Sequence, residues 1–251
     1  MSNELIVLTC TLRPKSLVDI RRKDHEVRIK DYEIAIKKWI KFSEMGDFDL
    51  LILENSGSAY VLEDLVLSKT NITLIQSEDD LRSSNEGISG GEFYMLKSCL
   101  NQEILDKYAF IWKVSGRNFV RNAHDALKRT GCVDVLCDRT FLVRHACDSR
   151  MFGMSSTAWI EFLSLDLRFK KKNGGFASSL TFDSMEHLLT FFVANLEFSG
   201  GVQRALAASP IFEGFSGSTN KLIVTRRRRI LLRLQKPFRP LIHKLLLGVS
   251  P

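Results

Sequence analysis

The sequence lacks several features that would assign it quickly to a class of protein. No stretch approaches the roughly 18 uninterrupted apolar residues that a membrane-spanning helix needs. The first ten residues, MSNELIVLTC, have neither the basic start nor the long apolar run of a secretory signal. None of the five histidines pairs with another at metal-ligand spacing. From the first two of these absences we expect a cytoplasmic protein with no transmembrane segment and no leader.

Paired cysteine motifs are also lacking. The five cysteines are an odd number and include no C-x-x-C pair. We expect reduced thiols that pack as small hydrophobic groups, in a reducing compartment. These residues are Cys10, Cys99, Cys132, Cys137 and Cys147.

Most of the chain lacks excess positive charge, although the formal net charge of the 251 residues is +7. Nine of the 36 Lys and Arg residues lie in 221–251, which contains no Asp or Glu. The remaining 27 cations face 29 acids, so residues 1–220 carry a net charge of −2. A protein that binds nucleic acid over a broad surface has cations spread over that surface. Nucleic-acid binding by residues 1–220 is therefore not favoured.

The basic tail has an amphipathic pattern over 225–247. Pro237 and Pro240 would divide it into two short helices. Such a segment favours an anionic membrane surface, with about 1 kcal/mol per cation near the headgroups. A helix docked on the body and an RNA-binding segment are the alternatives. Its apolar residues recur at alternating spacings of three and four: Leu231, Leu234, Phe238, Leu241 and Leu245.

Strand-like and helix-like segments alternate along the first 145 residues. The apolar runs predict strands at 4–9, 49–53, 71–76, 108–114, 134–137 and 140–145. The 3.6-residue periodicity predicts helices at 31–42, 59–68 and 91–105. This order indicates an α/β fold with a mostly parallel sheet.

Beyond about residue 150 the alternation weakens. Helices are expected at 156–165 and 182–198, the second capped by Thr181 or Asp183. Polar loops are expected at 170–179 and 210–220. We expect one large domain at 1–220, divided into a first half at 1–145 and a second half at 146–220. The tail at 221–251 follows it.

In parallel sheets the ligand lies beyond the carboxyl ends of the strands. That rule selects Thr9–Arg13, Glu54–Ser58, Ser77–Glu92 and Lys113–Arg117, all of which are polar or glycine-bearing. In the last stretch, cations beside Gly116 suit a phosphate or diphosphate, because glycine allows close approach. A solvated strand end with a turn glycine is the alternative.

Three other clusters have two readings each. Ser89–Glu92 opens the predicted helix, where backbone N–H groups favour anions and an acid also complements the helix dipole. Asp79 and Asp80 could hold Mg²⁺ or Mn²⁺, or form a solvated acidic loop. Glu54 and Asn55 could bind a nucleobase or ribose, or simply form a turn.

Taken together, these segments resemble a group of bacterial glycosyltransferases that assemble lipopolysaccharide and capsule. The likeness covers roughly residues 5–220. It rests on the helix start Gly90–Glu92, the Lys-x-Ser-Gly-Arg box Lys113–Arg117, the Arg-x-Phe-Gly segment Arg150–Gly153 and the loop Phe212–Gly214.

The resemblance implies a GT-A-like fold, in which a nucleotide-sugar lies across the carboxyl ends of a Rossmann-like half. In many such enzymes the fourth strand ends in an Asp-x-Asp metal motif, whereas here Lys113–Arg117 takes that place. It therefore implies metal-independent catalysis, in which Lys113 and Arg117 neutralise the leaving phosphate. Glu186 would be the general base for the acceptor hydroxyl.

The resemblance also implies the rest of the site. Arg150 and Glu213 would bind the acceptor, and the tail would hold the enzyme at the inner membrane. A non-catalytic RNA- or membrane-binding module acting through the Arg-rich tail is the alternative. The nucleotide-sugar would contact Thr9, Arg13, Glu54, Asn55, Gly91, Glu92, Ser115 and Gly116.

Overall fold

A computed structural model describes most of the chain. The expectations about Asp79, the loop 170–179 and the tail 225–247 fall outside the described residues and stay predictions. So does the metal role of Asp80, of which the backbone alone is described. The described residues are 4–15, 20–46, 48–77, 80–129, 131–140, 146–169, 180–216, 220 and 223.

A seven-stranded sheet forms the centre, with the strand order β10-β6-β7-β4-β1-β2-β3. Among these strands only β7 runs antiparallel to its neighbours. The predicted α/β fold with a mostly parallel sheet is therefore confirmed. The strands are β1 (Glu4–Cys10), β2 (Phe48–Glu54), β3 (Ile72–Gln76), β4 (Phe110–Ser115), β6 (Val135–Thr140), β7 (Ala146–Ser155) and β10 (Gln203–Ala205).

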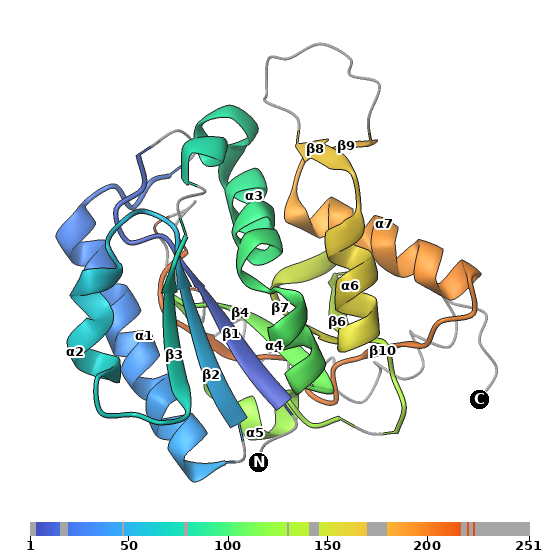
Figure 1. Ribbon diagram of the computed structural model, residues 1–251, viewed down its shortest axis with the longest axis horizontal. Coiled ribbons are helices and arrows are strands. Elements are labelled where there is room, and N and C mark those ends of the chain that lie inside the picture. Colours follow the sequence, from blue (N-terminus) through green and yellow to red (C-terminus); the bar gives the residue numbers. More distant parts are fainter. Residues whose placement is uncertain are drawn as a thin grey trace.

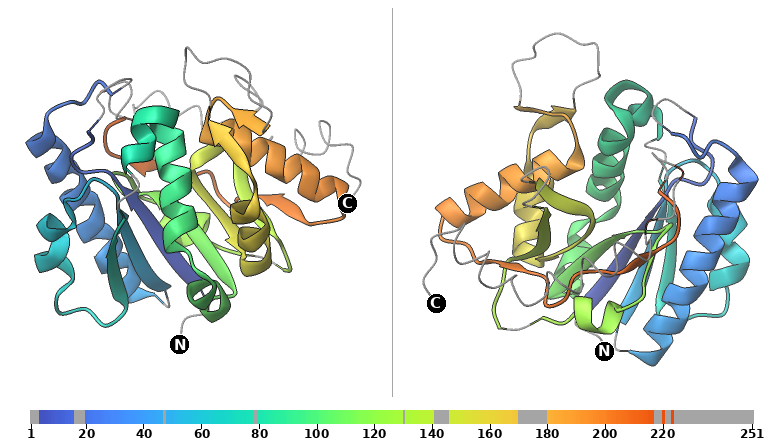
Figure 2. Two further views of the ribbon diagram at one scale, coloured as in Figure 1. Left: turned by 45° about the horizontal axis from the view of Figure 1, so that its top comes forward. Right: turned by 180° about the vertical axis from the view of Figure 1, so that it is seen from behind.

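Helices cover both faces of this sheet (Figures 1 and 2). One face carries α1 (His25–Met45), η1 (Ala59–Leu62), α2 (Glu63–Val66) and α5 (Ala123–Ala126). The other carries α3 (Asp80–Cys99), α4 (Gln102–Lys107), α6 (Ser156–Ser164) and α7 (Met185–Phe198). No described helix is long and apolar enough to cross a bilayer.

The apolar patterns explain this arrangement. Along β1, alternate residues enter opposite cores: Val7 packs beneath α3, and Leu8 packs beneath α1. The predicted apolar face of α1 is buried as expected, including Ile36 and Trp39. A strand that is buried on both faces needs a continuous run of apolar residues, and the sequence of β1 has such a run.

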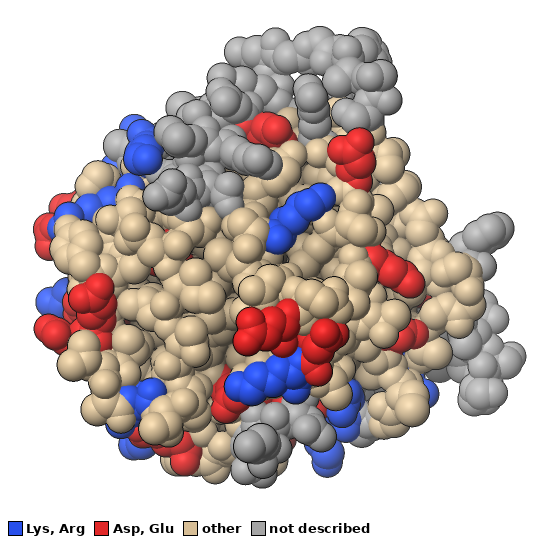
Figure 3. Space-filling view, in the orientation of Figure 1, with Lys and Arg blue, Asp and Glu red and all other residues tan. Residues whose placement is uncertain are grey.

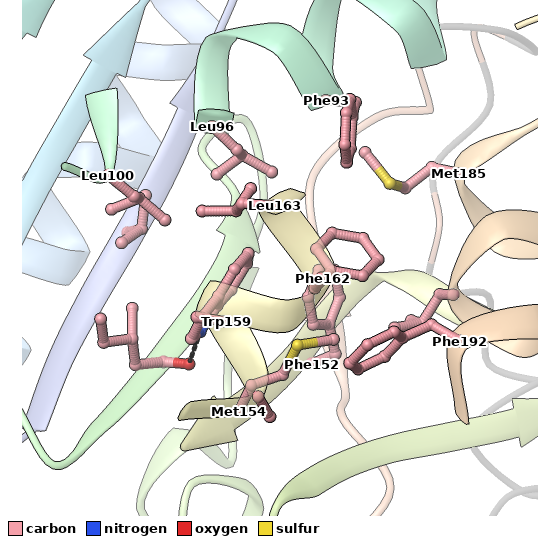
Figure 4. Close-up of a cluster of buried hydrophobic side chains, with 14 of the residues drawn as sticks. Phe93, Leu96, Leu100, Phe152, Met154, Trp159, Phe162, Leu163, Met185 and Phe192 are labelled. Atoms are coloured by element: carbon pink, nitrogen blue, oxygen red, sulfur yellow. Dashed lines mark hydrogen bonds between the residues drawn. The ribbon is translucent and has the colours of Figure 1, made fainter. Parts of the chain in front are cut away.

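The core beneath α3, α6 and α7 joins the two halves of the chain (Figure 4). Phe162 lies at its centre, in edge contact with Phe93 of α3 at 5.6 Å and with Phe192 of α7 at 5.2 Å between ring centroids. The indole N–H of Trp159 donates to the carbonyl oxygen of Ile111 in β4, at 3.0 Å. The second half is thus packed directly on strands of the first.

The predicted helix 91–105 is two helices, because α3 ends at Cys99 and α4 starts at Gln102. The stretch before it, expected as a rim loop, is helical from Asp80. Gly87 interrupts α3 with φ 75°, a conformation that residues with a Cβ rarely adopt. Ser89–Glu92 therefore opens the second helical segment, as expected, with Gly91 buried in its first turns.

The long strand β7 was not predicted, because the alternation of strand-like and helix-like segments weakens beyond about residue 150. It lies between β4 and β6, and Gly153 makes this possible. A Cβ on Gly153 would lie 2.6 Å from the ring of Trp112, so only glycine allows the strands to close. The cap of α7 also differs from prediction: Ser184, rather than Thr181 or Asp183, accepts from the N–H of His187 at 3.3 Å.

Two small sheets complete the described fold. β8 (Leu167–Phe169) and β9 (Leu180–Phe182) are parallel, and β5 (Phe119–Val120) and β11 (Phe212–Glu213) are antiparallel. Because β5 follows β4, β11 brings residues 206–216, here called the returning segment, back from β10 to the first half (Figure 2, right).

All five cysteines lie in the described part, and none forms a disulfide. Four are buried, as expected for small hydrophobic side chains, while Cys132 is exposed. Burial raises the pKa of the Cys10 thiol, and the charge of Glu54 raises it further while Arg117 lowers it. Cys10 is therefore a protonated packing residue.

Candidate functional site

The predicted rim segments do meet at one edge of the sheet. Thr9 in β1 is in register with Ser115 in β4, and Cys10 is in register with Glu54 in β2. Since β7 is antiparallel, its beginning lies at this same edge, next to the end of β4. The carboxyl edge therefore combines segments from both halves of the chain.

Lys113 occupies the middle of this edge but is not exposed. The strand continues to Ser115, and Lys113 is fully buried within it. Its Nζ lies 2.6 Å from Oε1 of Glu92 and donates to the carbonyl oxygen of Ser149 at 2.7 Å. Acceptors from α3 and β7 satisfy Lys113 inside the fold, so it is not a solvated strand end, and its predicted role at the leaving phosphate stays a prediction.

Glu92 links this buried cation to β1. Its Oε1 accepts from the hydroxyl of Thr9 at 2.8 Å as well as pairing with Lys113. The Glu92 side chain keeps 20% of its surface exposed, so it lies at the boundary between the core and the edge. Sequence patterns predicted that Thr9, Glu92 and Lys113 each lie near a ligand. They did not indicate that these three residues contact one another.

Glu186 lies on the other side of Lys113, in the first turn of α7. Its Oε1 accepts a hydrogen bond from the hydroxyl of Ser149 at 2.7 Å. The chain of contacts Thr9–Glu92–Lys113–Ser149–Glu186, here called the central network, therefore runs from β1 to α7. Ser149 was not identified as a site residue from the sequence.

Arg150 is held next to this network. Its guanidinium makes several hydrogen bonds to the carboxylate of Asp148 and lies 4.3 Å from the ring centroid of Phe212. Burial alone would lower the pKa of Arg150, but the hydrogen bonds and charge of Asp148, with the charges of Glu186 and Asp138, raise it overall. Arg150 is thus a permanent cation facing the start of α7.

Glu54 has a structural role at this edge, and its predicted contact with a nucleoside stays a prediction. Its carboxylate is fully buried and accepts from the backbone N–H groups of Leu12 at 3.1 Å, Ser56 at 3.0 Å and Ser58 at 2.8 Å. These bonds use both oxygens and shape the loops that follow β1 and β2. The neighbouring Asn55 accepts through Oδ1 from the hydroxyl of Thr11 at 2.7 Å, directly at the edge.

Arginines lie around the end of β1. Arg13 donates to the hydroxyl of Tyr60 at 2.6 Å, and Arg117 donates to the carbonyl oxygen of Phe215 at 3.1 Å. Arg28, which the sequence did not single out, is buried and donates to the carbonyl oxygens of Thr11 and Leu12.

The three arginines differ in what they can reach. Burial lowers the pKa of Arg28, and its carbonyl partners make it a support for the loop. Arg117 is half-buried and lies 5.8 Å from the ring centroid of Tyr32. Arg13 is part-exposed and lies 3.3 Å from Glu26. Arg13 and Arg117 therefore remain the candidates to meet an anion at this edge.

Gly116 is required by packing against β1. Its N–H donates to the carbonyl oxygen of Thr9 at 2.9 Å. A Cβ at this position would lie 3.0 Å from that oxygen and would overlap the sulfur of Cys10. Packing alone thus requires a glycine here, and the predicted close approach of a phosphate stays a prediction.

Glu213 lies in β11, beside α1. Its carboxylate lies 2.6 Å from Nζ of Lys38 in α1 and 2.8 Å from Nε of Arg121. The hydrogen bond from Lys38 lowers the pKa of Glu213, and the charge of Arg121 lowers it further against the effect of burial. Glu213 therefore fastens the returning segment to α1, and its predicted contact with the acceptor stays a prediction.

Within the described ranges, no three His, Cys, Asp or Glu side chains gather where they could hold a metal ion. The metal alternative at Asp79 lies outside those ranges. On the face shown in Figure 3, acidic and basic side chains are interspersed, in keeping with the small net charge of residues 1–220.

Comparisons with known proteins give similarities of fold only. No protein-family model and no curated protein sequence matches the chain. Among solved structures, the inositol-1-phosphate CTP transferase from T. maritima aligns with 92% of this chain and 95% of its own, at 10% identity and a TM-score of 0.47. A candidate nucleotide-diphospho-sugar transferase from Desulfovibrio desulfuricans G20 aligns with 82% of this chain and 80% of its own, at 10% identity and a TM-score of 0.49.

S. aureus TarS, solved with UDP-GlcNAc, aligns with 93% of this chain and 65% of its own, at 10% identity and a TM-score of 0.42. At such values the likeness concerns the general path of the chain and assigns no activity. The chain is thus an α/β protein whose candidate site lies at the carboxyl edge of a mostly parallel sheet.

Proposed function

We propose that the protein is a bacterial glycosyltransferase that moves a sugar from a nucleotide-sugar donor to a hydroxyl of a surface polysaccharide, lipopolysaccharide or capsule. The observation that carries the proposal is the central network. It places a buried Lys–Glu pair at the carboxyl edge and connects it to a carboxylate, Glu186, at the start of α7. The motif resemblance Lys113–Arg117 supports the same class.

The donor would lie along the ends of β1, β2 and β4, where parallel sheets bind their ligands. Thr9, Asn55 and Arg13 are the polar groups on the nucleoside side. Arg117 is the cation for the diphosphate, because Lys113 is already neutralised by Glu92. The resemblance implied that Lys113 and Arg117 both neutralise the leaving phosphate. In the present proposal Arg117 alone has that role.

In the transfer step, the acceptor hydroxyl oxygen forms a bond to the anomeric carbon of the donor sugar. The bond from that carbon to the diphosphate oxygen breaks, and its electron pair leaves on the diphosphate. Glu186 takes the hydroxyl proton as general base. Arg117 stabilises the negative charge that develops on the leaving group.

A donor panel tests the proposal. Thermal shifts with UDP-, GDP-, CMP- and dTDP-sugars should raise Tm for one nucleotide class, because a ligand that binds only the native state stabilises it. Donor turnover should fall roughly tenfold or more in Arg117→Ala, which removes one charge-assisted contact. Arg129→Ala, at the opposite edge beside Glu4, is the matched control and should turn over donor normally. No shift with any donor, together with normal turnover by Arg117→Ala, would overturn the proposal.

We propose further that the reaction needs no metal ion, since Arg117 would stabilise the charge of the leaving diphosphate instead. Turnover should survive EDTA. If EDTA abolishes it and Mn²⁺ restores it, the metal-independent part of the proposal is wrong, and Asp79 and Asp80 become the first positions to mutate.

The tail would hold the enzyme at the anionic inner-membrane surface. Ile223 is buried in the core, so a truncation should retain it and remove only 225–251. The truncated protein should turn over soluble substrates normally and no longer float with anionic vesicles. Equal flotation of both proteins would exclude the membrane role, and loss of RNA binding alone would favour the non-catalytic alternative for the tail.

A further inference from the structure

We infer that Ser149 is the positioning residue that orients Glu186 for proton abstraction. The inference rests on the proposed transferase function and adds a residue that the sequence did not suggest. The hydroxyl of Ser149 donates to Oε1 of Glu186 at 2.7 Å, while no hydrogen bond to Oε2 is formed by the described residues. One carboxylate oxygen is thus held, and the other is left to accept a proton.

Ser149 can hold this carboxylate because its own backbone is fixed. Its carbonyl oxygen accepts from Nζ of Lys113 at 2.7 Å, and Lys113 is in turn paired with Glu92. Ser149 is also buried, at 7% exposure. A hydroxyl on a fixed strand, in a site with little water, sets the direction of its partner more firmly than a surface group could.

A second link holds the backbone of Glu186 to the same strand. The hydroxyl of Thr190 donates to the carbonyl oxygen of Glu186 at 2.7 Å and accepts from the N–H of Cys147 at 2.8 Å. Strand β7 therefore fixes both the backbone and the side chain of Glu186. Two attachments to one strand leave the carboxylate little freedom of rotation.

The nearby cation Arg150 explains why the Glu186 carboxylate needs to be held. The charge of Glu186 helps to raise the pKa of Arg150, so the two groups attract each other, although Asp148 already holds the guanidinium. A carboxylate paired with Arg150 would be a poor proton acceptor. The Ser149 hydroxyl keeps Oε1 in place against this attraction.

A double-mutant cycle on kcat tests the inference. Ser149→Ala should lower kcat roughly tenfold, part of the 10²–10⁴ that a positioned base contributes, with the donor KM unchanged. In the Glu186→Gln background, Ser149→Ala should have no further effect, because it acts only through Glu186. Ser149→Thr keeps the hydroxyl and should retain most of the rate.

Two further variants separate positioning from folding. Ser149→Cys keeps the shape of the side chain with a slightly larger atom but is a weak donor, so it should lose rate like the alanine variant while keeping a Tm close to that of wild type. Ser43→Ala removes another buried serine hydroxyl, on the opposite face of the sheet, and should leave kcat unchanged.

Different results would reject the proposed function and the role of Ser149. A wild-type protein that turns over no donor would reject the proposed function itself. An active wild type in which Ser149→Cys keeps full kcat would overturn the role of Ser149. So would a cycle in which the two substitutions act additively, or a Glu186→Gln variant with wild-type rate.

Discussion

Lys113 shows what a buried cation needs from its surroundings. Taking an ammonium group out of water costs several kcal/mol unless opposite charge and hydrogen bonds replace the lost hydration. Glu92 supplies the charge and the carbonyl oxygen of Ser149 supplies a further acceptor. Each member of the pair therefore depends on the other, and removing one leaves the second uncompensated.

We predict that Lys113→Met lowers the free energy of unfolding by about 2 to 3 kcal/mol, toward the low end for a broken buried pair because Glu92 is partly exposed. The double variant Lys113→Met/Glu92→Gln should recover at least half of that loss. Urea denaturation measures both. Lys69→Met, which breaks a half-exposed pair with Glu44, is the control and should change stability by less than about 1 kcal/mol. A similar loss in both variants would contradict the interpretation of Lys113.

Gly116 makes a prediction based on packing. Gly116→Ala would press a methyl group against the sulfur of Cys10 and the backbone of Thr9, and should destabilise the protein by about 1 to 3 kcal/mol. Cys10→Ala removes the sulfur that the methyl meets, so the double variant Cys10→Ala/Gly116→Ala should lose less than the sum of the two single changes. Thermal denaturation of all three proteins tests this, and strict additivity would show that the contact does not limit position 116.

Sequence reasoning at this scale located the edge but did not find the partners of the charged groups that lie there. Residue type and strand position correctly brought Thr9, Glu54 and Lys113 together. Whether a charged side chain is exposed depends on its partners, however. Those of Lys113 lie 21 and 36 residues away in the chain, on α3 and β7. No single-sequence pattern records such distant pairings.

The helix α7 shows how an element presents a functional group. Ser184 caps it by accepting from the N–H of His187, and Glu186 follows two residues later. The position of the carboxylate therefore depends on where the helix starts. A frayed first turn would move Glu186 away from β7.

We predict that Ser184→Ala lowers stability by about 1 kcal/mol through loss of this cap, and lowers turnover together with it. Ser184→Asp should restore both, since aspartate caps equally well and its charge suits a helix start. Ser164→Ala, at the last residue of α6, should change neither. Activity that stays normal while stability falls would separate the helix start from the site.

Elements with a clear period were predicted well, and those defined by tertiary contacts were not. Strands β1 to β4 and helix α1 follow from apolar runs and 3.6-residue spacing. Strand β7 was missed because Asp148, Arg150 and Gly153 interrupt its apolar run. The first two pair with each other, and Gly153 is explained only by its neighbour Trp112 in β4. The break at Gly87 depends likewise on a local backbone angle that composition does not reveal.

On the scale of the whole molecule, the returning segment ties the second half to α1 through Glu213. The hydrogen bond from Lys38 lowers the pKa of Glu213 in the folded state. A depressed carboxyl pKa contributes stability above the ordinary value of 4.5, and this contribution disappears as pH falls through the lowered folded value. The segment should therefore loosen in acid.

We predict that Glu213→Gln lowers the free energy of unfolding at pH 7 and has progressively less effect as pH falls below 4.5, the ordinary carboxyl value. Urea midpoints measured from pH 7 to pH 3 test this. The exposed acid Glu103 on α4 provides the control, since Glu103→Gln should leave the curve close to that of wild type. A destabilisation by Glu213→Gln that stays constant with pH would rule out the ion pairs as its cause.

The place of β7 in the sheet also affects how the chain can fold. Strand β4 gains its second neighbour only from residues 151–155, and the core around β1 is completed by Ile223. On the ribosome, an emerging chain that ends near residue 145 would expose one side of β4 as an unpaired hydrophobic edge. Such late, long-range closure slows folding and exposes the nascent chain to aggregation. The first half should therefore depend on chaperones until the second half has been synthesised.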